Sequence, residues 1–77
     1  DDDTVEAVST LGLQSGMVLA RDLHAVSGML LLNEGKELTE RLIDKLIAFE
    51  KGEPEGTRYT LFVYRTDDSD EQTVEAG

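Results

Sequence analysis

The chain has 77 residues, a formal net charge of −10, one histidine and no cysteine. This length permits a single small domain, and the missing cysteines exclude disulfide bonds and a thiolate zinc site. The acidity argues against direct binding to nucleic acid, because phosphates need a basic surface, and no apolar stretch approaches the roughly 18 residues of a membrane-spanning helix.

A domain of this size has a thin hydrophobic core, because it buries only about 60% of the surface that its unfolded chain exposes. Small domains compensate with disulfides, metals or association. The single histidine gives little basis for a metal site, so we expect association, no metal and no cofactor. The chain opens on three aspartates and not on methionine, which indicates a piece of a larger protein.

The acidic residues are concentrated at the two ends of the chain. Residues 1–10 and 66–77 together hold nine Asp and Glu and no Lys or Arg, whereas residues 11–65 hold eight acidic and seven basic residues. Blocks of like charge are usually solvated and disordered, although some serve as interaction tails. We therefore predict an acidic N-terminal segment over 1–10 that includes a candidate edge strand, a single α+β domain over 11–65 and a disordered acidic tail over 66–77.

The first half of the chain reads as three strands separated by turns. Residues 4–9 alternate weakly and favour an extended strand, and Gln-Ser-Gly at 14–16 predicts a turn. Residues 17–23 are apolar on both faces at first and then alternate, as in a strand that is buried at one end. Residues 29–32 form an apolar run of strand length. Turns are predicted before and after this run, at 25–28 and at the Asn-Glu-Gly-Lys of 33–36.

A helix is predicted to begin after Thr39, a residue type that caps helix N-termini. Leu38 and Ile43 stand at the positions of a hydrophobic staple. Gly52 and then Pro54 mark the end of the helix. One apolar stripe at helical spacing runs along it, so the helix is expected to pack on a sheet with one face. The stripe consists of Leu42, Ile43, Leu46 and Ile47.

The last strand is predicted over 58–65, after a loop at 53–56. It is rich in aromatic and β-branched residues, and its alternation places Tyr59, Leu61 and Val63 on one face. The order is then strand, strand, strand, helix, strand. We predict an α+β fold, a small twisted antiparallel sheet or partly open barrel of about four strands with one covering helix.

Three local patterns suggest chemistry, and each has a simpler interpretation. His24 has no local nucleophile to pair with and reads as a surface residue at a strand end, since a general base needs a positioned partner. Gly35-Lys36 lacks the other residues of a phosphate-binding loop and reads as a turn. Residues 67–71 have the composition of a calcium loop without its glycine and its last glutamate, so no metal site is predicted there.

The candidates for ligand binding are Arg21, Asp22, Arg58 and Arg65, which lie on or beside the predicted strands. An exposed pair such as Arg21 and Asp22 is usually a solvated salt bridge that contributes less than about 1 kcal/mol. A pocket for an anion such as a cyclic dinucleotide would instead gather several arginines near a turn. The aromatic residues of the last strand could stack on a ligand but are more often part of a core.

The runs LQSGMVLARDL at 13–23 and GMLLLNEGKELT at 28–39 resemble a small module found beside bacterial signalling domains. That module accompanies HD-type metal-dependent phosphohydrolases, including the cyclic-di-GMP phosphodiesterase branch, and response-regulator receivers. The likeness extends from residue 13 to about residue 50, and more loosely through the last strand. Its pattern is mainly structural, with glycines at turns, apolar strands and a helix cap. The matching positions are Leu13, Gly16, Met17, Arg21, Asp22, Gly28, Leu31, Gly35, Leu38 and Thr39.

The resemblance implies a C-terminal accessory domain of a bacterial two-component response regulator or a related cyclic-dinucleotide signalling protein, in the cytoplasm. The His-Asp metal ligands of the phosphohydrolase are missing, so we expect no catalysis. The leading hypothesis is a non-catalytic regulatory or protein-interaction domain. It would dock on a neighbouring receiver or HD-type domain of the same polypeptide, or form a homodimer, and would bind neither nucleic acid nor membrane. The alternative is a sensor that binds a small anionic signal such as a cyclic dinucleotide through Arg21, Arg58 or Arg65.

Overall fold

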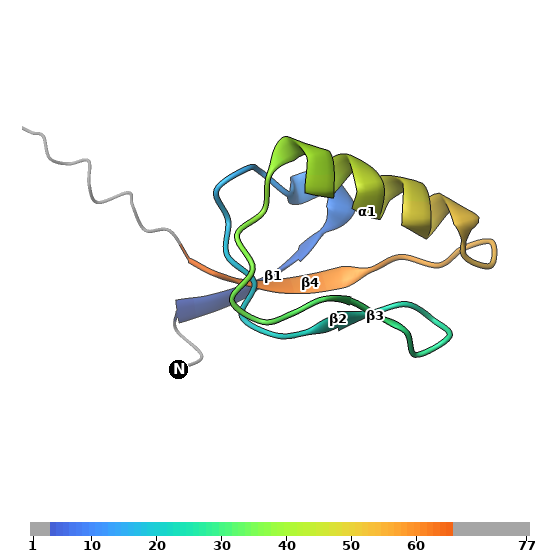
Figure 1. Cartoon of the computed structure of the whole chain (residues 1–77), viewed down its shortest axis with the longest axis horizontal. Coiled ribbons are helices and arrows are strands. Elements are labelled where there is room, and N and C mark those ends of the chain that lie inside the picture. The colour runs from blue at the N-terminus through green and yellow to red at the C-terminus, as the bar shows by residue number, and fades with distance from the viewer. Residues whose placement is uncertain (1–3, 66–77) are drawn as a thin grey trace, which may run out of the picture.

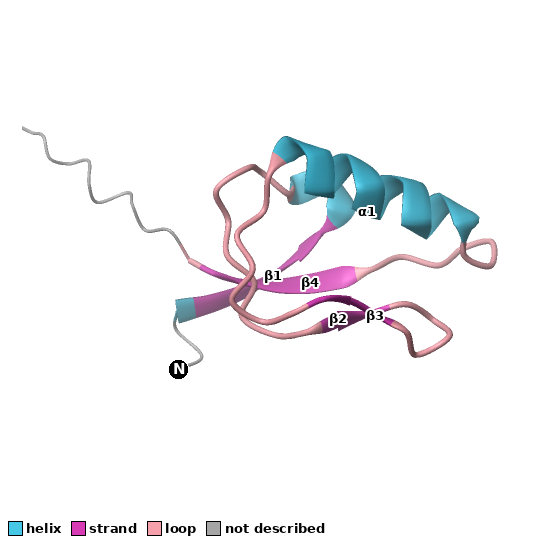
Figure 2. Cartoon of the chain, in the orientation of Figure 1, coloured by secondary structure: helices cyan, strands magenta, loops and turns pink. Residues whose placement is uncertain are grey.

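A computed structural model describes residues 4–65 of the chain, so the acidic tail and the calcium-like run at 67–71 lie outside the described residues. The fold is α+β, with one helix and four strands in two small antiparallel sheets that stay open and do not close into a barrel (Figures 1 and 2). The predicted order of elements is confirmed. In chain order the elements are β1 (Val5–Ser9), the 3-10 helix η2 (Thr10–Gly12), β2 (Leu23–His24), β3 (Leu30–Leu32), α1 (Glu40–Gly52) and β4 (Thr60–Tyr64).

The first sheet joins the two ends of the described chain. Strands β1 and β4 are antiparallel, with Val5 opposite Tyr64 and Ser9 opposite Thr60. The alternation predicted for the last strand is confirmed, because Leu61 and Val63 are buried whereas Thr60 and Tyr64 are exposed. The rest of the core therefore packs against the buried face of β4.

The segment predicted as one strand over 17–23 is divided between two neighbours. Its second half pairs with β3 in a short ladder that changes register between Leu23 and His24. Its first half hydrogen-bonds on both edges: Leu19 N donates to the Lys36 carbonyl oxygen at 2.9 Å, and Ala20 N donates to the Phe62 carbonyl oxygen at 2.7 Å. Each neighbour pairs with this half through a single isolated bridge, Val18 with Glu37 and Leu19 with Val63, so no regular ladder forms there and the strand is shorter than predicted.

Glycine residues allow the chain to reverse direction at the predicted turns. Gly28 closes the β2–β3 turn at φ 97° and Gly35 follows β3 at φ 90°, in the left-handed region that strains other residues. Asn33, in the turn predicted at 33–36, does not adopt this conformation, and no described residue other than glycine has a positive φ. The turn therefore relies on Gly35 alone for that conformation.

Helix α1 begins after Thr39 as predicted, but the conformation at its C-terminal end differs from the prediction. The Thr39 hydroxyl oxygen accepts a hydrogen bond from Leu42 N at 3.2 Å, which caps the helix N-terminus. At the other end Gly52 is the last helical residue and not a left-handed cap, and Glu53 N donates to the Glu50 carbonyl oxygen at 3.1 Å. Pro54 follows and prevents the helix from continuing.

Helix α1 lies above the strands in Figure 1, and the hydrophobic core lies between the helix and the strands. Of the predicted apolar stripe, Leu46 is fully buried, at 3% exposure, and the other three residues are half-buried. One deeply buried helical side chain suffices because strands and loops supply the rest of the core. The buried apolar residues are Leu13, Leu19, Leu23, Leu38, Leu46, Tyr59, Leu61 and Val63.

Leu46→Ala is expected to lower the free energy of unfolding by about 2–5 kcal/mol, because it leaves a cavity under α1. Leu11→Ala is the matched control, since Leu11 is 91% exposed and the same truncation there should change stability by less than about 0.5 kcal/mol. Urea unfolding followed by circular dichroism measures both. Equal effects of the two substitutions would contradict this packing.

Candidate functional site

Three of the four predicted ligand-binding residues line one cleft. Arg21 and Asp22 approach it from the segment before β2, and Arg58 approaches it from the chain that leads into β4. The hollow has a volume of about 440 Å³, and we call it the arginine cleft. Arg65 does not line it, because it follows β4 and its backbone N donates to the Thr4 carbonyl oxygen at 2.7 Å.

Arg21 and Asp22 do not form the salt bridge expected of neighbouring charges. The Arg21 guanidinium lies over the Phe62 ring, 4.5 Å from its centroid, in a cation–π contact. The Asp22 carboxylate accepts a hydrogen bond from Glu34 N at 2.6 Å and so holds the turn that follows β3. Consequently the carboxylate supports the backbone while the guanidinium stays at the cleft.

Arg58 and His24 also line the arginine cleft. Arg58 is exposed, and its Nη1 donates to the Thr57 carbonyl oxygen at 3.2 Å. His24 is the last residue of β2 and is exposed, which agrees with its interpretation as a surface residue at a strand end. The hydroxyl-bearing residues Thr57 and Thr60 also line the hollow, so polar groups face it from both chain segments.

Two carboxylates at the C-terminal end of α1, which we call the carboxylate clasp, fasten the helix to the surrounding chain. Glu50 accepts from the Thr10 hydroxyl at 2.8 Å and from Tyr59 N at 2.6 Å. Glu53 accepts from the Tyr59 hydroxyl at 2.5 Å and from Val26 N at 3.0 Å. The clasp thus connects α1 to η2, to the start of β4 and to the β2–β3 turn.

The clasp shifts the pKa values of two of its members. The hydrogen bond from Tyr59 N lowers the pKa of Glu50, burial opposes this, and the Thr10 hydroxyl and the charge of Arg58 add to the lowering. Burial, and then the hydrogen bond to Glu53, raise the pKa of Tyr59 to about 12. Glu50 is therefore ionised and Tyr59 neutral at physiological pH. The sequence did not predict this hydrogen-bond network, because Glu50 and Glu53 stand in a stretch whose pattern indicates only the end of a helix.

A second hollow, which we call the apolar groove, lies between the end of α1 and the β2–β3 turn. It has a volume of about 470 Å³, and its lining includes Met29 and Phe49 together with Ala25, Ala48 and the acidic Glu53. Met29 is 52% exposed and Phe49 46% exposed, and Val26 in the same turn is also exposed. This surface was not predicted from the sequence, and the signal for it was Phe49, which stands outside the predicted apolar stripe.

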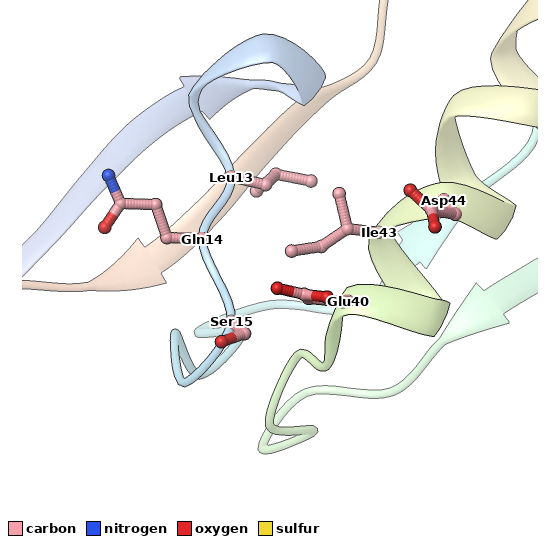
Figure 3. Close-up of a pocket in the computed structure, with 6 residues that line it drawn as sticks. All are labelled: Leu13, Gln14, Ser15, Glu40, Ile43 and Asp44. Atoms are coloured by element: carbon pink, nitrogen blue, oxygen red, sulfur yellow. The ribbon is translucent and has the colours of Figure 1, made fainter.

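A third hollow lies beside the N-terminal turn of α1, and Figure 3 shows the residues that line it. Leu13 and Ile43 point toward one another, and the carboxylates of Glu40 and Asp44 lie on the helix side. Two acidic side chains at a helix N-terminus complement its partial positive charge and need no ligand. Within residues 4–65 there is no group of three His, Cys, Asp or Glu side chains that could hold a metal ion.

Comparison with protein-family models, curated proteins and solved structures finds no match to this chain. No helix among the described residues is long and apolar enough to cross a membrane.

Glu50→Gln is expected to lower the free energy of unfolding at pH 7 by about 1–2 kcal/mol, because an amide cannot accept both hydrogen bonds. Since the folded pKa of Glu50 lies below its unfolded value, its contribution is present above the unfolded pKa. It is lost as pH falls through the folded pKa. Urea unfolding from pH 7 to about pH 3 should show a loss in the natural chain that is smaller in Glu50→Gln. Glu55→Gln, at an exposed loop position, is the control and should behave like the natural chain.

Proposed function

We propose that this chain is a non-catalytic protein-interaction domain of a bacterial two-component response regulator, located in the cytoplasm. It docks through the apolar groove on a neighbouring receiver or HD-type domain of the same polypeptide. The observation that carries the proposal is the pair of exposed apolar side chains, Met29 and Phe49, on two adjoining elements. The sequence resemblance supplies the class of partner.

Among the exposed large apolar residues, Met29 and Phe49 line the apolar groove and Val26 lies in the same turn, whereas Leu11 and Tyr64 are exposed elsewhere. Single exposed apolar side chains are common on soluble proteins, but a contiguous apolar surface often marks an interaction site. Phe49 also lines a smaller hollow with Leu31 and Leu42, so the apolar surface continues along α1 toward β3. Because the core of this domain is thin, covering that surface would also stabilise the fold.

Basic side chains on α1 beside the groove favour an acidic neighbour over a second copy of the chain, although Glu53 lines the groove itself. Arg41, Lys45 and Phe49 are spaced four residues apart and therefore share one side of α1, and Lys45 lines the hollow next to Phe49. This side presents cations beside an apolar centre. Two copies, each with a net charge of −10, would repel one another mainly through the acidic residues at 1–10 and 66–77. A receiver or HD-type domain with an acidic, apolar-centred surface fits better.

Docking becomes regulatory if the partner binds the groove with different affinity in its two signalling states. A domain shifts such an equilibrium only by the difference between its affinities for the two states. A groove of this size can provide a small, reversible interface of the kind that joins domains within one chain. The proposal therefore needs no bond-forming chemistry in the domain itself.

The two methionines allow a direct test by methyl NMR. In the full parent polypeptide the Met29 methyl signal should shift relative to the isolated 77-residue chain, because docking would bury it. The Met17 signal should stay in place, because Met17 is half-buried against the core and outside the groove. Coincident Met29 signals in the two samples would contradict docking through this surface.

Phe49→Ser in the parent polypeptide should return the Met29 signal to its position in the isolated chain, because it removes the largest apolar contact of the groove. Leu11→Ser is the control, since Leu11 is exposed on η2 and does not line the groove. Both variants should keep the Met17 signal of a folded domain. An equal effect of the two substitutions would point to general loss of apolar surface and not to this groove.

A further inference from the structure

We propose that the arginine cleft is a binding site for a nucleotide-like anion, in which a phosphate group stands next to a planar ring. This site is distinct from docking through the apolar groove, because Arg21 and Arg58 do not line that groove. Its basis is the convergence of Arg21 and Arg58, from segments far apart in the sequence, on one hollow of about 440 Å³. Volumes of this order are typical of small-molecule sites.

The carboxylates around the arginine cleft are occupied elsewhere. Asp22 accepts from Glu34 N, and Glu50, whose charge Arg58 partly offsets, directs both of its oxygens to Thr10 and Tyr59. Within residues 4–65 neither Arg21 nor Arg58 is held by a carboxylate in a salt bridge. In a chain of net charge −10, two guanidinium groups without such partners form a local site for an incoming anion.

Arg21 is arranged to recognise a flat group as well as a charge. Its guanidinium lies over the Phe62 ring at 4.5 Å, so one face is covered and the side chain is positioned before any ligand arrives. Arg21 is exposed, so its other face is accessible to a planar ring. Guanidinium planes stack on nucleobases as they do on aromatic side chains, and fixing the cation beforehand reduces the entropy lost on binding.

The chain that leads into β4 supplies the groups that a phosphate needs. Arg58 can donate a pair of parallel hydrogen bonds to phosphate oxygens, and Thr57 and Thr60 bring hydroxyl groups to the same cleft. Tyr59, which also lines the cleft, is held neutral by a pKa raised to about 12 and so adds no repelling charge. The cleft therefore combines a stacking cation, Arg21, with a phosphate-binding cation, Arg58.

The test is a titration of ¹⁵N-labelled chain with guanosine 5′-monophosphate at low salt, followed by amide NMR. The expected result is saturable shifts at His24 and over 57–60, with a Kd on the order of 1 mM or tighter. Arg21→Gln and Arg58→Gln should each weaken binding roughly tenfold. Arg65→Gln is the matched control, because it removes the same charge outside the cleft and should leave the Kd within about twofold.

Two further ligands separate the components of the proposed site. Guanosine, which lacks the phosphate, should shift these amides at least tenfold more weakly, since the charge-assisted hydrogen bonds are lost. Inorganic phosphate should also bind more weakly than the nucleotide, because it cannot stack on Arg21. Inorganic phosphate binding as tightly as the nucleotide would overturn the stacking role. Absence of saturable shifts, or an Arg65→Gln effect equal to that of Arg21→Gln, would overturn the site.

Discussion

The fold depends on the short run of chain at 17–20, which is hydrogen-bonded along both edges. On one edge Leu19 N donates to the Lys36 carbonyl oxygen, and Gly35 N donates back to the Leu19 carbonyl oxygen at 2.8 Å. On the other edge Tyr64 N donates to the Val18 carbonyl oxygen at 3.0 Å. This run joins the two small sheets, neither of which is large enough to be independently stable. Leu19 is fully buried at this junction, so backbone pairing and apolar burial coincide at one residue.

The carboxylate clasp at the end of α1 provides the second constraint, and it acts on a thin core. Only Leu46 of α1 is fully buried, so apolar packing alone holds the helix weakly. Glu50 and Glu53 add hydrogen bonds to β4, η2 and the β2–β3 turn, and bonds to charged groups are among the stronger ones. The same contacts position Tyr59 between the arginine cleft and the helix. The clasp therefore stabilises the fold and shapes both candidate surfaces.

Local patterns in the sequence were sufficient for most of the fold, and tertiary pairing accounts for what they missed. The cap at Thr39 and the alternation through β4 depend on neighbours in sequence, so their prediction was confirmed. The division of residues 17–23 between two partners depends on residues 35–38 and 62–64, which no local pattern can reveal. The candidate site shows the same division between what local patterns predict and what the folded chain adds. Arg21 and Arg58 were named from composition, but their convergence, and the exposure of Phe49 beside the β2–β3 turn, required the folded chain.

The two proposed surfaces are physically connected, which constrains how they would act together. Ala25 lines both the arginine cleft and the apolar groove, and Glu53 holds Val26 N on one side and the Tyr59 hydroxyl on the other. An anion that moved Tyr59 would therefore act on Glu53 and on the turn that forms the groove. By linkage, any change that the anion makes in docking affinity must be matched by an equal change that docking makes in anion affinity. If neither the anion nor the docking partner alters the hydrogen bonds of Glu53, the coupling free energy is zero and the two surfaces act independently. The Glu53 carboxylate is thus the group at which coupling between the two sites would be decided.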